Sequence, residues 1–291
     1  MNYRHIYHAG NFADVVKHAA LALIIDHLRL KPAPFRVIDT HAGIGLYDLS
    51  AIEAEKTGEW RDGIGRLLSE PLPAPVAELL TPYLAAVMAE NPGWQSGTNL
   101  PVYPGSPVIA RNMLRSGDAL VVNELHPEDF ESLRMTMARD KQTKVMNQDG
   151  WTALKGLLPP KERRGVILID PPFEEPGELA RLTQALTDAV RRFATGTFVL
   201  WYPIKDQRPV FAFRRELVDG GFEKLLSVEL LIKPTTGEGL AGCGLAILNP
   251  PYGLKEKLDI LLPYFAEIFA QAPPGASSEV RWLATERARA S

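Results

Sequence analysis

A short apolar segment that ends in two prolines limits the folds open to this chain more than any other stretch. The segment GVILIDPPF spans residues 165–173. A β-branched run of this length is typical of a buried strand, and proline stops the strand because it has no N–H for the hydrogen-bond ladder. Asp170 is therefore predicted at the carboxyl end of a strand, the edge where open α/β sheets bind their ligands. Taken alone, Asp-Pro-Pro-Phe could equally be a simple strand terminator.

Composition indicates a globular protein of a reducing compartment. Hydrophobic residues make up 46% of the 291 residues and charged residues 23%, which is ordinary for a chain with a full core. The first residues include histidines and an aspartate where a secretion signal needs an apolar segment, and the apolar run 19–25 is too short to span a membrane. The single cysteine, Cys243, fits a cytoplasmic location. His5 and His8 lack a second ligand pair, so no metal site is expected.

The charge of the chain constrains its partners. A formal net charge of −3 argues against indiscriminate binding to nucleic acid. A nucleic-acid substrate would therefore need a local basic surface. Two arginine pairs, at 163–164 and 191–192, are candidate phosphate contacts, although such pairs are more often solvated surface.

The first third of the chain begins with a helix and a strand. Residues 14–30 carry apolar side chains at helical spacing, with Asp14 as the predicted N-cap. Lys17 and His18 lie in this helix, where residue type alone favours a solvated face. A strand over 35–39 runs into the turn THAGIG, which is expected to open a helix. Gly43 in this turn has no Cβ, so backbone N–H groups could approach a nucleotide-like ligand.

An acidic residue usually follows the second strand and holds ribose hydroxyls. Here residues 49–99 instead read as helices, over 52–68 and 76–88, broken by prolines. The α/β pattern resumes after YPGSP at 103–107, with a helix from Val108 and a strand over 119–124. Glu124 is therefore predicted as the displaced ribose-binding carboxylate. The predicted domains are a core of 1–48 and 100–283, an inserted helical subdomain of 49–99 and a frayed tail of 284–291.

The second half supplies three more elements of the pattern. A helix over 127–139 and a strand over 144–148 lead to the turn Asp149-Gly150, which suits a hydrogen bond to an adenine amino group. The fifth strand is expected over 197–201. Two strand-like runs, 224–232 and 245–248, have no helix between them and should form an antiparallel hairpin.

This order of elements resembles a class I S-adenosylmethionine (SAM)-dependent methyltransferase. That fold is α/β and Rossmann-like, with a mostly parallel seven-stranded sheet and an antiparallel terminal hairpin. Asp-Pro-Pro-Phe resembles the signature of enzymes that methylate an exocyclic amino nitrogen, most often adenine N6. The Asp170 carboxylate and a carbonyl of the Asp170-Pro171 turn could accept hydrogen bonds from the amino group and localise its lone pair. Phe173 offers a face for a base taken out of its stack.

A second candidate for this signature is Asn-Pro-Pro-Tyr at 249–252. If the preceding run is antiparallel to the other strands, its carboxyl end emerges at the opposite edge of the sheet from Gly43. Asn249 is therefore predicted to be a strand terminator outside the site.

A closer resemblance covers nearly the whole chain. The motifs YRHIYHAGNFADVVKH, DTHAGIGLYDL, YPGSP, NELHP, LIDPPFE, RRFATGTFVLWYP and the late NPP together resemble the ribosomal large-subunit RNA adenine-N6 methyltransferase J family (RlmJ). The resemblance implies Asp170 as the catalytic carboxylate and Tyr3 as a substrate contact. It also implies a set of cofactor contacts, to which we add Gly43 and Lys17: His18, His41, Ser106, Glu124, Asp149 and Gly150. Two departures are mild, Phe173 in place of a frequent tyrosine and Phe12 where histidine can occur.

The resemblance implies a cytoplasmic enzyme that methylates N6 of one adenine in 23S ribosomal RNA, with SAM as methyl donor. We expect no membrane and no metal partner, and a monomer. A DNA adenine methyltransferase would share the chemistry, but we see no added target-recognition domain. A protein glutamine methyltransferase would use Asn-Pro-Pro-Tyr at the fourth strand, where Asp170 stands. A non-catalytic RNA-binding module would have no reason to keep Glu124, Asp149 and Asp170.

Overall fold

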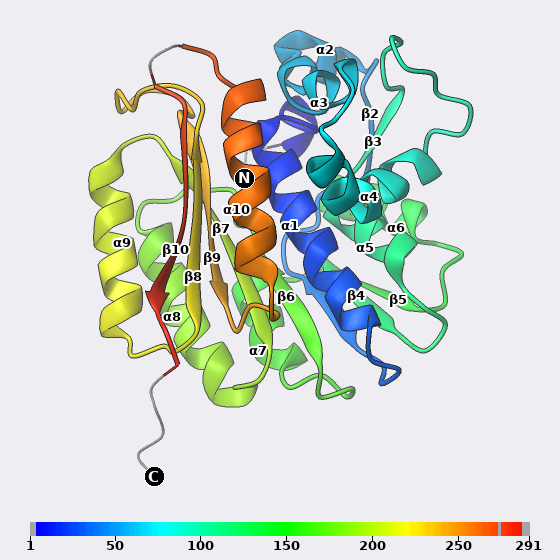
Figure 1. The fold of residues 1–291 in the computed structure, drawn as a ribbon. Coiled ribbons are helices and arrows are strands. Elements are labelled where there is room, and N and C mark those ends of the chain that lie inside the picture. The colour runs from blue at the N-terminus through cyan, green and yellow to red at the C-terminus, as the bar shows by residue number, and fades with distance from the viewer. Residues whose placement is uncertain (1–3, 273–274, 287–291) are drawn as a thin grey trace.

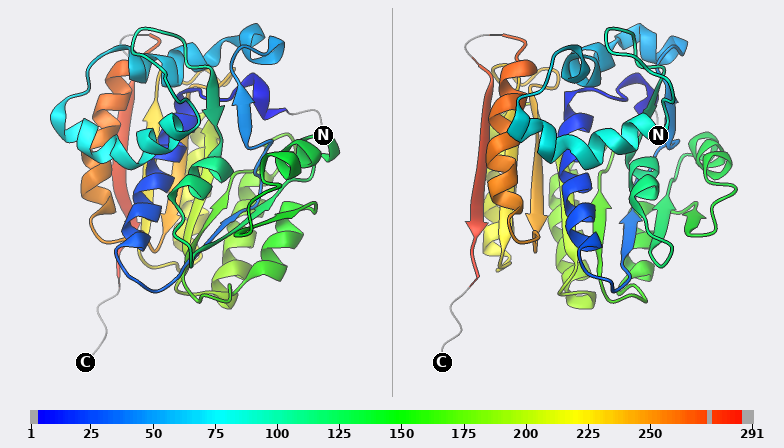
Figure 2. Two further views of the ribbon diagram at one scale, coloured as in Figure 1. Left: turned by 90° about the vertical axis from the view of Figure 1, so that its right-hand side faces the viewer. Right: turned by 45° about the vertical axis from the view of Figure 1, so that its right-hand side comes forward.

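The computed structural model describes residues 4–272 and 275–286, in which helices cover both faces of one eight-stranded sheet (Figures 1 and 2). In spatial order the strands are β10 (Ser277–Ala284), β8 (Leu225–Leu231), β9 (Gly242–Leu248), β7 (Thr197–Ile204), β6 (Gly165–Ile169), β1 (Arg36–Asp39), β4 (Ala119–Asn123) and β5 (Thr143–Met146). The five strands from β7 to β5 are parallel, and β9 runs antiparallel to both of its neighbours. The predicted fold class and the terminal hairpin are confirmed.

The sheet has one strand more than the sequence pattern predicted. β10 pairs antiparallel with β8 along its whole length and forms the edge of the sheet. Its alternation of polar and apolar side chains is confined to residues 279–282, which is too short a run to have indicated a strand. Of the expected tail, Ala284 ends β10, and residues 287–291 lie outside the described residues.

Two apolar clusters fill the space between the sheet and the helices, one on each face of the sheet. One face of the sheet is covered by α1, α5 and α10, and the other by α7, α8 and α9 (Figure 1). The helices outside the 49–99 segment are α1 (Phe12–Arg29), α5 (Ser106–Met113), α6 (Pro127–Thr136), α7 (Gly150–Leu157), α8 (Glu178–Arg192), α9 (Gln207–Asp219) and α10 (Leu254–Ile268), preceded by the short 3-10 helix η1 (His5–Tyr7). Within the described residues, none of these helices combines the length and apolarity that a bilayer crossing needs.

Helix α1 lies in the interior of the molecule, so the expectation of a solvated face was wrong. Fifteen of its 18 residues are buried, including Lys17 and His18. Its N-cap is Asn11, whose side chain accepts a hydrogen bond from the backbone N–H of Asp14. Asp14 is therefore a buried residue of the first turn and not the cap. The helix is covered by α4, α5 and α10, which the sequence pattern placed only in part.

The glycine-rich turn after β1 does not open a helix, contrary to expectation. It runs into β2 (Leu46–Asp48), which pairs antiparallel with β3 (Val102–Pro104) in a separate two-stranded sheet. The helix that follows β1 in the core is α5, which the chain reaches only after residues 49–99. The helix that follows β1 in the core therefore comes after residues 49–99 in the chain.

Residues 49–99 form α2 (Ile52–Thr57), the π-helical turn η2 (Arg61–Gly65), α3 (Arg66–Ser69) and α4 (Ala74–Ala89). The single helix predicted over 52–68 was wrong, because α2 ends at Gly58 in the left-handed conformation. The apolar side chains of this segment join the same cluster as α1 and α10. A separate subdomain over 49–99 stays a prediction.

Candidate functional site

A cavity of about 710 Å³ opens at the carboxyl ends of the parallel strands. The predicted site residues that line it are Lys17, His18, His41, Gly43, Ser106, Glu124, Asp149, Gly150, Asp170, Pro171 and Phe173. Tyr3 lies outside the described residues. The fold therefore gathers side chains from α1, α5 and the ends of four strands around one space.

Buried Asn123 holds three strand ends together next to the cavity residues His41, Glu124 and Asp149. Its side-chain amide donates to the carbonyls of Thr40 and Gln148, at 3.0 and 2.9 Å, and its side-chain oxygen accepts from Gln148 N. These contacts join the ends of β1, β4 and β5. The loops that follow the strands are thereby fixed relative to one another.

Glu124 follows β4 and is anchored by backbone N–H groups. One carboxylate oxygen accepts from Gly43 N and the other from His126 N, both at 2.8 Å. Burial raises the pKa of this carboxyl, and the two N–H groups oppose that rise. Each carboxylate oxygen has a second acceptor position, so Glu124 can still receive hydroxyl donors from a ligand.

The loops after β1 and β5 touch closely, and this contact requires glycine at position 150. A Cβ there would lie 2.5 Å from His41 Nε2 and 2.9 Å from the carbonyl oxygen of Thr40. Burial lowers the pKa of His41 to about 4, so the imidazole is neutral at neutral pH. Asp149 caps α7 by accepting from Thr152 N at 2.9 Å.

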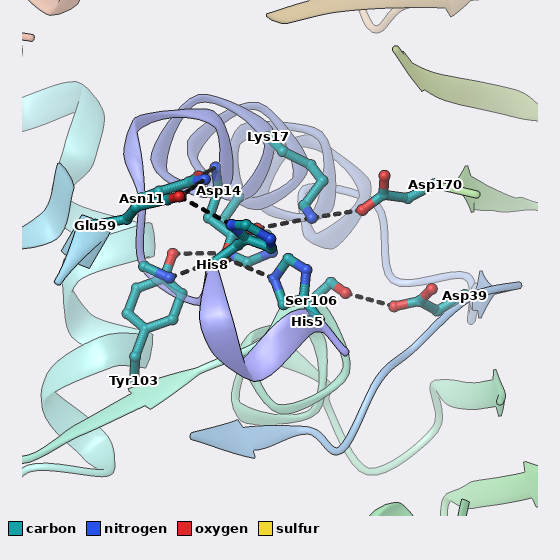
Figure 3. Close-up of polar contacts among 12 residues, drawn as sticks. His5, His8, Asn11, Asp14, Lys17, Asp39, Glu59, Tyr103, Ser106 and Asp170 are labelled. Atoms are coloured by element: carbon teal, nitrogen blue, oxygen red, sulfur yellow. Dashed lines mark hydrogen bonds and ion pairs between the residues drawn. The ribbon is translucent and has the colours of Figure 1, made fainter. Parts of the chain in front are cut away.

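Asp39 ends β1 behind the cavity wall and positions Ser106. The Ser106 hydroxyl donates to Asp39 Oδ2 at 2.6 Å (Figure 3). Burial raises the pKa of Asp39 to about 6, although the Ser106 hydrogen bond and Lys17 lower it. A buried carboxyl at the end of the first strand therefore sets the rotamer of a predicted cofactor contact.

Lys17 links the first helix to the predicted catalytic carboxylate. Its ammonium lies 2.8 Å from Asp14 Oδ1 and 2.5 Å from Asp170 Oδ2 (Figure 3). Burial alone would lower the pKa of Lys17, but the two carboxylates raise it above its ordinary value. The pKa of Asp14 is held well below its ordinary value, because His5, Lys17 and His18 together outweigh its burial. Asp170 is thus fixed by a buried charge-assisted hydrogen bond.

His18 presents a buried nitrogen, Nε2, that has no hydrogen-bond partner among the described residues and lies 3.8 Å from Asp14 Oδ1. Its Nδ1 is hydrogen-bonded to the Tyr103 hydroxyl at 2.7 Å, and Tyr103 in turn contacts Tyr83 at 3.0 Å. Nε2 has no hydrogen bond, although His18 lines the cavity. Burial lowers the pKa of His18 well below its ordinary value, so the ring is neutral. Such an unsatisfied buried atom fits a site that is completed by a ligand.

Two aromatic rings form one wall of the cavity. Phe173 packs edge-on against Trp201, with ring centroids 5.7 Å apart, and the indole N–H of Trp201 is buried without a hydrogen bond. Phe173 has φ +53°, a left-handed conformation that is uncommon for a bulky residue. Strain of this kind is concentrated at functional sites.

The N-terminal segment closes the cavity on the side of α1. His5 and His8 line the cavity, and both are bound to acidic residues, His5 to Asp14 at 2.9 Å and His8 to Glu59 at 3.0 Å. Glu59 belongs to the 49–99 segment and also accepts from Asn11 (Figure 3). The 49–99 segment therefore contacts residues that line the cavity.

The second Pro-Pro motif lies at the opposite edge of the sheet, as expected. β9 is antiparallel to β7, and the Asn249 side chain donates to the carbonyls of Ala194 and Gly196, both at 2.9 Å, just before β7 begins. The arginine pairs lie away from the cavity as well. Residues 163–164 precede β6 and residues 191–192 end α8, and neither pair lines the cavity.

The sequence reasoning missed several residues that build the site. Asn123 and Asp39 stand at strand ends, where a polar residue after a buried run is the signal that could have found them. Trp201 was expected at the end of the fifth strand, but its place in the cavity wall beside Phe173 was not predicted. Asp14 and Glu59 gave no signal, because their importance depends on contacts between α1, the N-terminal segment and the insertion.

Comparison with known proteins gives one consistent result. The model of a family described as "Ribosomal RNA large subunit methyltransferase D, RlmJ" matches residues 32–284. The chain is 39% identical over 289 residues to the ribosomal RNA large subunit methyltransferase J of Haemophilus influenzae, and 38% identical over 288 residues to the Escherichia coli protein of that name. Each match covers 98% of this chain and 100% of the relative. A crystal structure of a Legionella pneumophila protein shares 36% identity with a TM-score of 0.84, over 94% of this chain and 98% of that one.

Proposed function

Because the chain belongs to the RlmJ family of ribosomal RNA large subunit methyltransferases, we propose that it transfers a methyl group from SAM to N6 of one adenine in 23S ribosomal RNA. The observation that carries the choice of an amino nitrogen is the turn Asp170-Pro171-Pro172-Phe173, which lies at the carboxyl end of β6 inside the large cavity. We place the reaction in the cytoplasm, with a monomer acting on the RNA.

The residues around the cavity fit a nucleoside-containing methyl donor. A volume of about 710 Å³ is within the range of cofactor sites. Glu124 would hold the ribose hydroxyls, Asp149 and Gly150 the adenine, and His18 would satisfy its free Nε2 on the ligand. His41, Ser106 and Gly43 complete the proposed contacts. SAM would supply a methyl group already activated on a sulfonium and would leave as S-adenosylhomocysteine. The chain's own residues would bind and orient the reactants, and the methylated amino nitrogen would lose one proton to water.

Asp170 is the proposed acceptor for the adenine amino group. Its Oδ2 is bound to Lys17, and its Oδ1 has no hydrogen bond among the described residues. Oδ1 and the nearby carbonyl of Pro171 could accept both amino hydrogens, which localises the nitrogen lone pair towards the methyl group. We assign Lys17 to the orientation of Asp170, because within residues 4–272 and 275–286 the ion pairs of its ammonium are with Asp14 and Asp170.

Phe173 would stack on the target base. The ring of Trp201 supports it from the side, and an aromatic face contributes roughly 1 to 3 kcal/mol of stacking free energy per base. The adenine would have to leave its stack to reach this depth, because Asp170 and Phe173 lie in the cavity wall.

The test is to incubate labelled SAM and the protein with unmodified 23S ribosomal RNA, with DNA and with ribosomal protein. We expect label only in the RNA, in one nucleotide that nuclease digestion and mass spectrometry identify as N6-methyladenine. Label in DNA would favour the DNA adenine methyltransferase alternative, and label in protein the glutamine alternative. A methyl group on another atom of the RNA would overturn the N6 assignment.

A further inference from the structure

A second, smaller groove lies beside the active cavity, between α7 and α8. Its volume is about 240 Å³, below the roughly 300 to 1,000 Å³ of small-molecule sites. It is lined by Trp151, Leu154, Lys155, Arg181, Gln184, Ala185, Asp188, Ala189 and Arg192. Trp151 and Arg181 line the active cavity too, so the groove begins where the cavity ends.

The groove is basic, in contrast to the cavity mouth. Three cations, Lys155, Arg181 and Arg192, line it with a single acid. Neither Lys155 nor Arg192 has an ion-pair partner among the described residues. The acid, Asp188, already accepts from Gln184 at 3.2 Å and lies 3.8 Å from Arg191 outside the groove. Positive charge is therefore left without an internal partner along a protein of net charge −3.

The loop after Phe173 contributes acidic side chains to the cavity, and negative charge disfavours the approach of phosphates. Glu174, Glu175 and Glu178 all line the cavity. The first two are exposed to solvent and Glu178 is buried. A flipped base could enter between them, but its neighbouring phosphates would have to leave by a less acidic path. The α7–α8 groove is adjacent to the cavity and carries the opposite charge.

An aromatic contact joins the two spaces. The Arg181 guanidinium lies 5.0 Å from the centre of a Trp151 ring, and Trp151 packs edge-on against His41 in the cavity. Basic grooves with an aromatic residue are typical of sites that bind single-stranded nucleic acid. On α8, Arg181 and Arg192 are eleven residues apart, about 16 Å along the helix, which is long enough for several nucleotides.

We propose that this groove binds the sugar-phosphate backbone of the single-stranded RNA that flanks the target adenine, with Lys155 and Arg192 as phosphate contacts. The inference rests on the proposed function and adds a second subsite to it. It gives Arg192 a role that its position away from the cavity did not suggest.

The test compares two double variants that remove the same charge. Lys155→Gln with Arg192→Gln removes two groove cations, whereas Arg29→Gln with Arg215→Gln removes two exposed cations from α1 and α9 outside the groove. Methylation of in vitro transcribed 23S ribosomal RNA is measured at several salt concentrations, with SAM affinity and Tm recorded for each protein.

We expect the groove variant to raise KM for RNA roughly three- to thirtyfold, the size of two exposed charge contacts. The slope of log affinity against log salt should become shallower by about 1.4, since each single-strand phosphate contact contributes about 0.7. SAM affinity and Tm should match the wild type, and the control should keep the wild-type slope. Equal effects of the two variants, or an unchanged slope in the groove variant, would overturn the proposal. If the wild-type protein does not methylate the RNA at all, the proposed function fails instead.

Discussion

At the scale of single residues, a substitution of Asp170 gives the most direct test of the proposed mechanism. One carboxylate oxygen is bound to Lys17, and the other is proposed to accept from the adenine amino group. Asp170→Asn keeps the shape but weakens the acceptor, so we expect kcat to fall about a hundredfold or more. SAM affinity, measured by calorimetry, should stay near the wild-type value because Asp170 is assigned to the base. Near-normal turnover in this variant would refute the mechanism.

Glu124 tests the methyl-donor site in the same way. Loss of its charge-assisted hydrogen bonds should cost roughly 1.5 to 3 kcal/mol, so Glu124→Ala should weaken SAM binding about tenfold or more. Glu131→Ala on the exposed face of α6 removes the same charge nearby and serves as the control. Equal SAM affinities for the two variants would remove Glu124 from the site.

Asp39 gives a prediction about pH and stability. Its pKa is about 6 in the folded protein against 3.8 for an ordinary aspartate. Between these values the folded state holds a proton that the unfolded state has lost, so this group's contribution to stability falls as pH rises from about 4 to about 6. Asp39→Asn should therefore gain up to about 3 kcal/mol relative to wild type between pH 4 and pH 7. Denaturant unfolding at the two pH values measures this, and parallel profiles would contradict it.

At the scale of elements, apolar periodicity and apolar runs predicted well the position of elements that are buried on at least one face. They located α1, α4, β4 and β6 to within a few residues. The prediction of a helix after the glycine-rich turn of β1 failed. Glycine in a turn indicates that the backbone needs an unusual conformation, but it does not indicate whether a helix or a strand follows. The prediction failed also for the 52–68 helix, whose path depends on a close tertiary approach. β10 escaped because an edge strand is specified by its partner β8.

That close approach can be tested at Gly63 in η2. A Cβ there would lie 2.1 Å from the carbonyl oxygen of Gly10, and Ile64 N donates to the same oxygen at 2.9 Å. Gly63→Ala should push η2 away from the start of α1 and lower Tm by several degrees, since roughly 1 kcal/mol corresponds to 2 to 4 °C or less at this chain length. Gly156→Ala in α7 meets no atom within 4 Å and should leave Tm unchanged or raise it slightly. Equal Tm values for both variants would show that η2 can move freely.

At the scale of the whole molecule, the two Pro-Pro motifs lie at opposite edges of the sheet. We expect the motif at Asp170 to act in the reaction and the motif at Asn249 to act only in stability. Asn249→Ala loses two hydrogen bonds and places alanine at φ +51°, so about 2 kcal/mol of stability should be lost. Turnover per folded molecule should stay near wild type, because Asn249 lies at the edge opposite Asp170. The measurement compares Tm and kcat with those of Asp170→Asn at matched folded concentration. A loss of activity without a loss of stability would show that the second motif takes part in the reaction.

The antiparallel direction of β9 could be predicted from the sequence, since a strand that follows another without an intervening helix must turn back. That inference placed Asn249 correctly at the far edge. The packing of residues 49–99 onto α1 and α10 could not be predicted. The pattern of an amphipathic helix shows which of its faces is buried, but not which other element that face packs against. The charged cluster of Asp14, Lys17 and Asp170 was hidden for the same reason.

The pairing of Lys17 with Asp170 also has a consequence for folding during synthesis. The two residues are 153 positions apart, and α1 packs against β9 and α10 from the last part of the chain (Figure 1). During synthesis the first helix emerges without the surfaces that cover it, and domains fold as units once their elements are available. The buried cations and acids of α1 are therefore stable only when synthesis is nearly complete. A nascent chain of this protein therefore carries Lys17 and Asp170 before it contains the segments that bury their ion pair.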